Sequence, residues 1–243
     1  MENKSFDYRL PRLFVEDDLE PGQSLLLKDE SGHYLKNVLR RKDGSQLRIF
    51  NGRHGEFLAR TDFSDRKKAF LRIDDLIRTQ TSRKNDVHLV FAPIKKDRMD
   101  FMIEKSVELG VTHFHPVLTQ QTIIREVNEE RLRKQIQEAA EQCERLDLPL
   151  LAPLKKIDLL IREWPEEISL FAALEREEAE NLKKLLKQDH LAILIGPEGG
   201  FSDSEKELLE KTAKIQAVSL GNDILRAETA ALYGLSLIKS VAG

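Results

Sequence analysis

The sequence contains little cysteine and few aromatic residues, and it lacks long hydrophobic runs. Cys143 is the one cysteine among 243 residues, so no disulfide can form within the chain and a cysteine-rich zinc site is excluded. No apolar run approaches the roughly 18–20 residues that span a bilayer, and the residues after Met1 show no secretory signal. We therefore expect a soluble, cytoplasmic protein with no membrane partner and no metal.

The composition is that of a globular chain with one large domain or two modest ones, because 40% of the residues are hydrophobic and 33% are charged. The net charge is -3, which argues against a polyanion-binding surface over the whole molecule. Residues 1–80 nevertheless contain 16 lysines and arginines against 14 acidic residues, and the acidic excess lies in the remainder. The first part of the chain is thus the better candidate for contact with nucleic acid, although the asymmetry is mild.

Short strands separated by turns are predicted over residues 1–77, and they indicate a small β-barrel domain. Two apolar segments flank Asn51-Gly52, a dipeptide typical of a β-hairpin. A single segment, residues 32–40, has helical spacing. A polar stretch, residues 78–85, follows as a linker.

Strands and helices alternate over residues 78–243, which predicts an α/β domain with a largely parallel sheet. The expected strands are residues 86–92, 111–118, 168–173, 191–195 and 217–220, and the expected helices are 97–109, 129–145, 175–187, the helix after the capping box Ser202–Glu205, and 227–241.

A glycine-rich loop, residues 196–200, follows the strand at Leu191–Ile195 and precedes the capping box. Open α/β sheets bind ligands at this position, although a plain strand-to-helix turn explains the glycines about equally well. The loop lacks the Gly-Lys-Ser/Thr ending of a phosphate loop and carries the acidic Glu198. An acidic, glycine-lined loop suits a neutral or cationic ligand, and a nucleoside with a sulfonium is of that kind.

A second loop with a glycine, residues 220–226, ends in Arg226 just before the last helix. An arginine side chain stays protonated, so Arg226 cannot act as a general base, but its planar guanidinium can stabilise a developing anion. The competing interpretation is an ordinary surface ion pair with Glu228. His88, His113 and His115 lie on or beside strands without the partners of a metal site, which favours packing or surface roles. Trp164 is expected to be a packing anchor.

Both loops, with several further motifs, resemble the ribosomal RNA small subunit methyltransferase E family of the knotted SPOUT superfamily. The resemblance covers nearly the whole chain. It is carried by Ile195–Ser202 and Leu220–Ala230, and also by Pro11–Val15, His33 with Val38–Arg40, Lys95–Asp100, Glu108–Val111, Glu138–Gln142 and Arg145.

The resemblance implies S-adenosylmethionine-dependent methylation of N3 of a uridine in 16S ribosomal RNA, in the decoding region of the small subunit. It also implies a PUA-like β-barrel RNA-binding domain over residues 1–77, a trefoil-knotted catalytic domain over 78–243, and a homodimer. Two alternatives remain open: a related RNA methyltransferase with another nucleotide target, and a non-catalytic RNA-binding factor.

The site residues follow from the same resemblance together with the charge pattern. Arg226 and Glu228 are the catalytic candidates, although a carboxylate in the first turn of a helix is also favoured by the helix dipole alone. The cofactor-binding candidates are Leu174, Glu175, Ile195, Gly196, Pro197, Glu198, Gly199, Gly200, Leu220, Gly221, Ile224 and Leu225. The RNA-binding candidates are Arg12, Lys36, Arg40, Arg41, Lys42, Arg98 and Arg125.

The chain departs from the family pattern in three places. Asp223 stands where an arginine is usual, Gln120-Gln121 where Glu-Arg is common, and Cys143-Glu144 where Ser-Gly precedes Arg145. The cofactor glycines are intact, so these departures concern the RNA contacts rather than the cofactor pocket.

Overall fold

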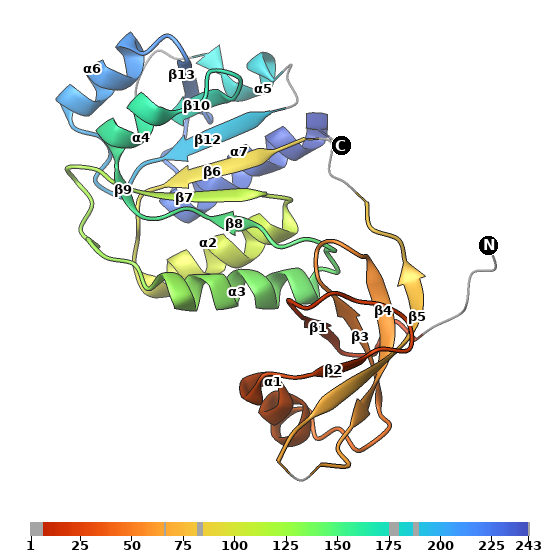
Figure 1. The fold of residues 1–243 in the computed structure, drawn as a ribbon. Helices are drawn as coiled ribbons and strands as arrows, with labels where there is room; N and C mark the ends of the chain where they lie inside the picture. Colours follow the sequence, from red (N-terminus) through yellow and green to blue (C-terminus); the bar gives the residue numbers. More distant parts are fainter. Residues whose placement is uncertain (1–6, 66, 82–84, 175–179, 187–189, 243) are drawn as a thin grey trace. The chain divides into compact units, whose positions relative to one another are not determined.

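The chain forms two structural units, which a computed structural model describes over residues 7–65, 67–81, 85–174, 180–186 and 190–242. Unit 1 comprises Met1–Ser82 together with Ala140–Asp147. Unit 2 comprises Arg83–Ala139 and Leu148–Gly243 (Figure 1). In the described part of the chain, no helix is both long and apolar enough to cross a bilayer.

Unit 1 is built on a five-stranded sheet whose order is β1-β3-β4-β5-β2. Its strands are β1 (Arg12–Phe14), β2 (Ser24–Leu26), β3 (Gln46–Phe50), β4 (Glu56–Asp62) and β5 (Phe70–Arg78), and its helical segments are α1 (Asp29–His33) and the π-helix η1 (Tyr34–Val38). The expected hairpin at Asn51 is confirmed, because β3 and β4 pair antiparallel on either side of it. Asn51 is buried, and its side-chain oxygen accepts the amides of Arg53 and His54.

A buried ionic cluster lies at one end of this sheet. The Glu56 carboxylate is fully buried and contacts Arg12 (2.5 Å), Arg48 (3.6 Å) and Arg78 (3.1 Å). Arg12 also donates to three main-chain carbonyls of residues 140–145. These bonds explain why a segment from the middle of the chain belongs to unit 1, which the sequence pattern did not indicate.

Unit 2 is an eight-stranded sheet with helices on both faces. The strand order is β11-β13-β10-β12-β6-β7-β8, with β9 paired to β7, and every pair that the structure describes is parallel. The strands are β6 (Val87–Phe91), β7 (His113–Leu118), β8 (Leu150–Leu151), β9 (Lys155–Lys156), β10 (Ser169–Ala173), β11 (Glu180–Asn181), β12 (Leu191–Ile195) and β13 (Ile215–Ser219). The prediction of an α/β fold with a parallel sheet is confirmed.

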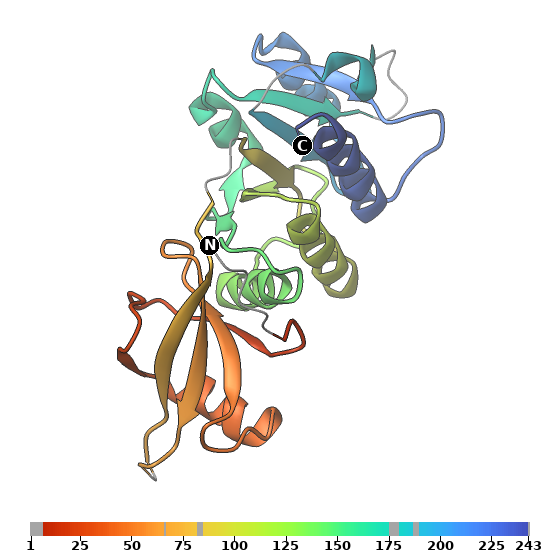
Figure 2. The same cartoon turned by 90° about the vertical axis from the view of Figure 1, so that its right-hand side faces the viewer.

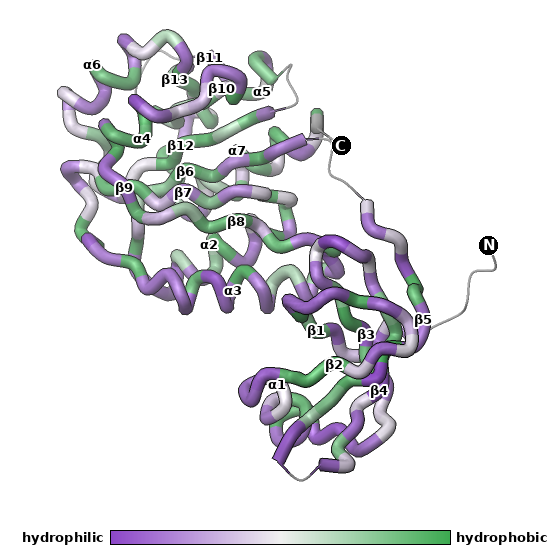
Figure 3. The backbone as a smooth tube through the Cα atoms, in the orientation of Figure 1, coloured by the Kyte–Doolittle hydropathy of each residue, from purple (hydrophilic) through white to green (hydrophobic). Residues whose placement is uncertain are grey.

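Six helices are described in or entering unit 2: α2 (Lys96–Glu108), α3 (Glu129–Gln142), α4 (Ile157–Glu163), α5 (Leu182–Leu185), α6 (Asp203–Lys211) and α7 (Ala227–Ala242). Figure 2 shows the sheet with α4 on one side and with α2 and α7 on the other. Residues of β12 alternate between these layers: Ala192 and Leu194 belong to the apolar cluster formed with α4 and α6, whereas Ile193 packs against Gly234 of α7. Both faces of the strand are buried, so β12 is apolar throughout, as the hydropathy colouring of Figure 3 shows.

Two helix predictions need correction. The helix expected over residues 129–145 ends at Gln142, because Glu144 adopts a left-handed conformation with φ 59°. Of the helix expected over 175–187, the described part contains the short strand β11 and the four residues of α5.

Candidate functional site

The two loops that contain glycine leave the same edge of the unit 2 sheet. β12 and β13 both pair in parallel with β10, which lies between them. The loop after Ile195 and the loop after Ser219 therefore start at the carboxyl ends of neighbouring parallel strands. Ligands of open α/β sheets bind outside these ends, so this edge is the candidate site.

Two glycines of the first loop, Gly196 and Gly199, pack against side chains, and the third, Gly200, is open. Gly196 lies against the ring of Phe201, and a Cβ at Gly196 would come within 2.9 Å of that ring. The Gly200 amide donates to the Pro197 carbonyl (2.9 Å) and closes a turn. Gly200 has φ 71°, and a Cβ there would meet no atom within 4 Å. The main chain at Gly200 is thus in a glycine-favoured conformation beside open space, which lets a ligand approach it closely.

The expected capping box at the start of α6 is confirmed and anchors the first loop. The Ser202 hydroxyl accepts from the Glu205 amide, and the Glu205 carboxylate accepts from the Ser202 amide (2.9 Å). Glu205 also accepts from the Gln120 amide (2.8 Å), and Gln121 packs against Gly199. The segment that departs from the family pattern at Gln120-Gln121 therefore packs directly on the glycine loop.

The second loop is exposed and open. Gly221 has φ 129°, and a Cβ there would meet no atom within 4 Å. Ile224 exposes 59% of its surface. Arg226 is exposed, and its carbonyl accepts from Ala230 in the first turn of α7. The loop thus presents main chain, an apolar side chain and an exposed guanidinium at the candidate edge.

Three charged side chains from different segments meet at this edge. Arg98, in the first turn of α2, contacts Glu198 of the first loop (3.5 Å) and Glu228 in the first turn of α7 (3.7 Å). α2 and α7 pack against each other, which brings their amino-terminal turns together. The sequence proposed Arg98 as an RNA contact and did not predict this cluster, because Arg98 lies far along the chain from both Glu198 and Glu228.

Not all of the predicted cofactor residues present side chains at the site. Leu174 and Ile195 are buried in the sheet core, with exposures of 4% and 3%, so they offer only main-chain groups. Pro197 is buried too, whereas Leu220 and Leu225 are half-buried and Glu198 is exposed. Glu175 lies outside the described residues.

The predicted RNA contacts of unit 1 fall into two groups. Lys36, Arg40, Arg41 and Lys42 lie in or just after η1, where Arg40 and Lys42 are exposed and Lys36 sits 4.6 Å from the ring centre of Phe63. Arg12 is different, since it is 8% exposed and its guanidinium is engaged by Glu56 and by main-chain carbonyls. We therefore remove Arg12 from the RNA-contact set. In unit 2, Arg125 is exposed and donates to the Thr119 carbonyl.

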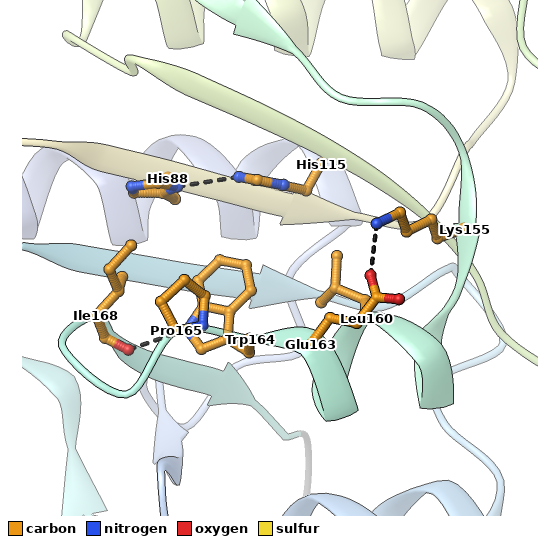
Figure 4. Close-up of a pocket in the computed structure, with 8 residues that line it drawn as sticks. All are labelled: His88, His115, Lys155, Leu160, Glu163, Trp164, Pro165 and Ile168. Carbon is orange, nitrogen blue, oxygen red and sulfur yellow. Dashed lines mark hydrogen bonds and ion pairs between the residues drawn. The ribbon is translucent and has the colours of Figure 1, made fainter.

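A small pocket between α4 and the sheet holds histidines whose arrangement the sequence did not predict (Figure 4). His88 stacks on His113 (ring centroids 4.3 Å apart) and shares a 3.0 Å hydrogen bond with His115. Trp164 packs edge-on against His88 and His115, and its indole donates to the Ile168 carbonyl. Burial, with the neighbouring histidine charges, lowers the pKa of His88 to about 3 and that of His115 to about 4. Both rings are therefore neutral packing groups at neutral pH, and Trp164 is the anchor that was expected.

Family models match both parts of the chain. A model described as an RNA methyltransferase domain matches residues 81–239, and one described as an RNA methyltransferase PUA domain matches residues 27–74. A ribosomal RNA small subunit methyltransferase E from Rickettsia conorii is 34% identical over 94% of this chain and 94% of its own length.

Solved structures agree with that match over nearly the full length. A methyltransferase from Legionella pneumophila, solved in complex with S-adenosylmethionine, has a TM-score of 0.87 and 32% identity, and covers 96% of this chain and 98% of its own. A ribosomal RNA small subunit methyltransferase E from Neisseria gonorrhoeae, also bound to S-adenosylmethionine, has a TM-score of 0.84 and 27% identity with the same coverage.

The parallel sheet, its glycine loops and the PUA-type unit thus define an RNA methyltransferase. The chain belongs to the ribosomal RNA small subunit methyltransferase E family.

Proposed function

We propose that this protein methylates N3 of a uridine in the decoding region of 16S ribosomal RNA, with S-adenosylmethionine as the methyl donor. The observation that carries the proposal is the convergence of the two glycine loops and the Arg98, Glu198 and Glu228 side chains at one edge of a sheet that matches the RNA methyltransferase model. The full-length match to small subunit methyltransferases supports the choice of ribosomal RNA.

The residues at this edge fit a sulfonium nucleoside. Gly200 and Gly221 border open space with their main chain, which allows hydrogen bonds to an adenine without side-chain obstruction. The exposed Ile224 and the half-buried Leu220 and Leu225 offer apolar surface for its faces. Glu198 is the nearby carboxylate that complements a positive charge. Bound there, S-adenosylmethionine supplies an electrophilic methyl group.

This chain's own residues then position the uridine and stabilise charge. A uracil N3 is paired in duplex RNA, so the target base must be unpaired or extruded before it enters the site. The exposed Arg226 guanidinium is suited to hold the uracil oxygens, on which negative charge develops when N3 loses its proton. Glu228 follows Arg226 closely in the chain and is 12% exposed, and its carboxylate is the group that accepts the N3 proton.

RNA binding is proposed for unit 1, through Lys36, Arg40, Arg41 and Lys42, with Arg125 as a contact from unit 2. Such contacts to phosphates position the substrate without reading its sequence.

The partner is 16S ribosomal RNA or the small subunit that contains it, and the location is the cytoplasm. We place the RNA-binding PUA-like β-barrel in residues 1–77 and the catalytic domain, with a trefoil knot, in residues 78–243. The catalytic domain pairs with a second copy as a homodimer, for which exposed Phe101 on α2 and Tyr233 on α7 offer apolar surface.

The test is methyl transfer to RNA from cells that lack this gene. The purified protein is incubated with labelled S-adenosylmethionine and either naked 16S RNA or small subunits, and the modified nucleoside is identified by chromatography and mass spectrometry. We expect 3-methyluridine at a single decoding-region position. A methylated ribose or another base would show a different target, and no incorporation with either substrate would overturn the proposal.

A further inference from the structure

Arg98 joins two carboxylates that come from different segments of unit 2. Its Nη1 lies 3.5 Å from Glu198 and its Nε lies 3.7 Å from Glu228. The Arg98 side chain is 35% exposed and that of Glu228 only 12%. The guanidinium is therefore held at both ends, and it restricts where the Glu228 carboxylate can point.

Glu228 uses only one of its oxygens in this contact. Its Oε1 faces Arg98, whereas its Oε2 is buried and has no hydrogen-bond partner in the described part of the chain. Among the described residues it is the only carboxylate oxygen in that condition. Buried acceptors almost always have a partner, and an orphan of this kind calls for an explanation. A donor on a bound substrate would supply the missing hydrogen bond.

The charges of this cluster argue against phosphate binding by Arg98. Both ion-pair partners of the Arg98 guanidinium are carboxylates, so an RNA phosphate that bound Arg98 would have to come close to Glu198 and Glu228. We therefore move Arg98 from the proposed RNA contacts to a role within the catalytic site.

We propose that Arg98 is a positioning residue that holds Glu228 with its free Oε2 toward N3 of the target uracil; this rests on the proposed function. The N3–H bond breaks and its proton passes to Oε2. The electron pair left on N3 forms the bond to the methyl carbon of the sulfonium donor, while the methyl–sulfur bond breaks and its electron pair returns to sulfur. Protons, electrons and the methyl group balance without any further reactant.

The experiment is a double-mutant cycle of Arg98→Gln and Glu228→Gln in the full chain, with kcat and KM measured for RNA methylation. Each single variant should lower kcat by about 100-fold or more, because proton transfer by a positioned group contributes roughly 10²–10⁴-fold. The double variant should be no slower than Glu228→Gln alone, since both changes remove one function. Calorimetry with S-adenosylmethionine and anisotropy with RNA should give affinities unchanged within about twofold, which also reports that the variants are folded.

Arg131→Gln is the matched control. Arg131 forms an ion pair with Asp100 of α2 and is similarly exposed at 33%, yet it lies outside the site. It should keep wild-type kcat. The deficit of Glu228→Gln should also shrink as pH rises, because the uracil loses its N3 proton unaided in alkaline solution.

Two results would overturn the positioning role while leaving the proposed function intact: losses in kcat that multiply in the double variant, or an Arg98→Gln variant with wild-type kcat. A deficit of Glu228→Gln that stays constant at every pH would reject Glu228 as the proton acceptor. Failure of the wild-type protein to methylate RNA at all would instead reject the proposed function.

Discussion

Arg48 and Glu144 form an ion pair of 2.8 Å although they lie 96 residues apart in the chain. Arg48 is buried in β3, and Glu144 holds the left-handed conformation that ends α3. A glycine takes this conformation without strain, and glycine is the usual residue here in the family that the sequence resembles. The ion pair with Arg48 offsets the strain, which explains how this chain accommodates a glutamate.

Replacing Glu144 by glutamine tests that compensation. Burial alone raises the pKa of Glu144, but the hydrogen bond and charge of Arg48, with the charges of Arg12 and Arg78, bring it below its ordinary value. The Arg48–Glu144 pair therefore stabilises the folded state fully at pH values above the ordinary pKa of glutamate. This stabilisation is lost as the pH falls through the lowered pKa of Glu144 in the folded protein. At pH 7 the variant should lose about 1 kcal/mol, a low figure because the carboxylate is 37% exposed and screened. Urea unfolding at pH 7 and pH 3 should show a smaller difference between the variant and the wild type in acid; an equal difference at both pH values would contradict the prediction.

Glu56→Gln should be far more disruptive. The Glu56 carboxylate is fully buried and contacts three arginines, so its removal leaves buried positive charge without compensation. Breaking such a buried pair costs about 3–5 kcal/mol, measured as a lower urea midpoint. Glu16→Gln, which removes the exposed pair with Lys28, is the control and should change little. Similar effects for both variants would mean that the buried cluster is not a stabilising centre.

The histidine cluster predicts a loss of stability in weak acid. His88 and His115 have pKa values lowered to about 3 and about 4, mainly by burial, so the unfolded chain binds more protons than the folded one below pH 6.5. Stability is full above that pH and falls as pH drops toward 4, by at most about 2.7 kcal/mol per pH unit for two groups. Unfolding midpoints from pH 7.5 to 4.5 measure this slope. The control His33→Gln, at an exposed position, should keep the same slope of stability against pH. A wild-type stability that does not change over this pH range would show that His88 and His115 are not held neutral by burial.

Gly200→Ala should abolish or strongly weaken cofactor binding. The new methyl group would enter the open space proposed for S-adenosylmethionine, and φ 71° adds backbone strain of about 1 kcal/mol. Gly44→Ala is a matched control, because Gly44 has φ 74° and equally open surroundings in unit 1. Both variants should lose similar stability, but only Gly200→Ala should change the calorimetric affinity. Equal affinities would exclude Gly200 from the pocket.

Reversing the charges of Arg40 and Arg41 should weaken RNA binding in a salt-dependent way. Each lost phosphate contact lowers the slope of log affinity against log salt by roughly 0.7–0.9, so the double variant Arg40→Glu/Arg41→Glu should lose about 1.5 in slope. Fluorescence anisotropy at several salt concentrations gives this number. Lys211→Glu, on exposed α6 of unit 2, is the control. An unchanged slope in the double variant would remove this patch from the RNA-binding surface.

Local signals in the sequence predicted most of the elements. Alternating or continuous apolar runs marked the strands, Ser202 and Glu205 marked the start of α6, and Asn51 marked the hairpin. Each of these signals acts over a few residues, because hydrophobic periodicity, caps and turns depend on neighbours in the chain. The end of α3 was missed for the same reason: Glu144 carries no helix-stop signal, and the partner that stabilises its conformation is Arg48.

The roles of charged residues were harder to predict. Arg12 looked like a surface cation, but its partners are Glu56 and the carbonyls at residues 140–145, which only folding brings near. His88 and His115 looked unremarkable until parallel pairing of β6 and β7 stacked them beside Trp164. In both cases burial depends on long-range contacts that no local pattern encodes.

The sequence by itself determined most strands and helices of the sheet domain, the two turns with glycine and the family resemblance, because these depend on short-range patterns of residue type. Only the tertiary structure decided that both turns open at one sheet edge, that Arg98 stands between Glu198 and Glu228, and that residues 140–147 belong to unit 1. The physical reason is that strand order and ion pairing join residues far apart in the chain, and their energies depend on burial that exists only after folding.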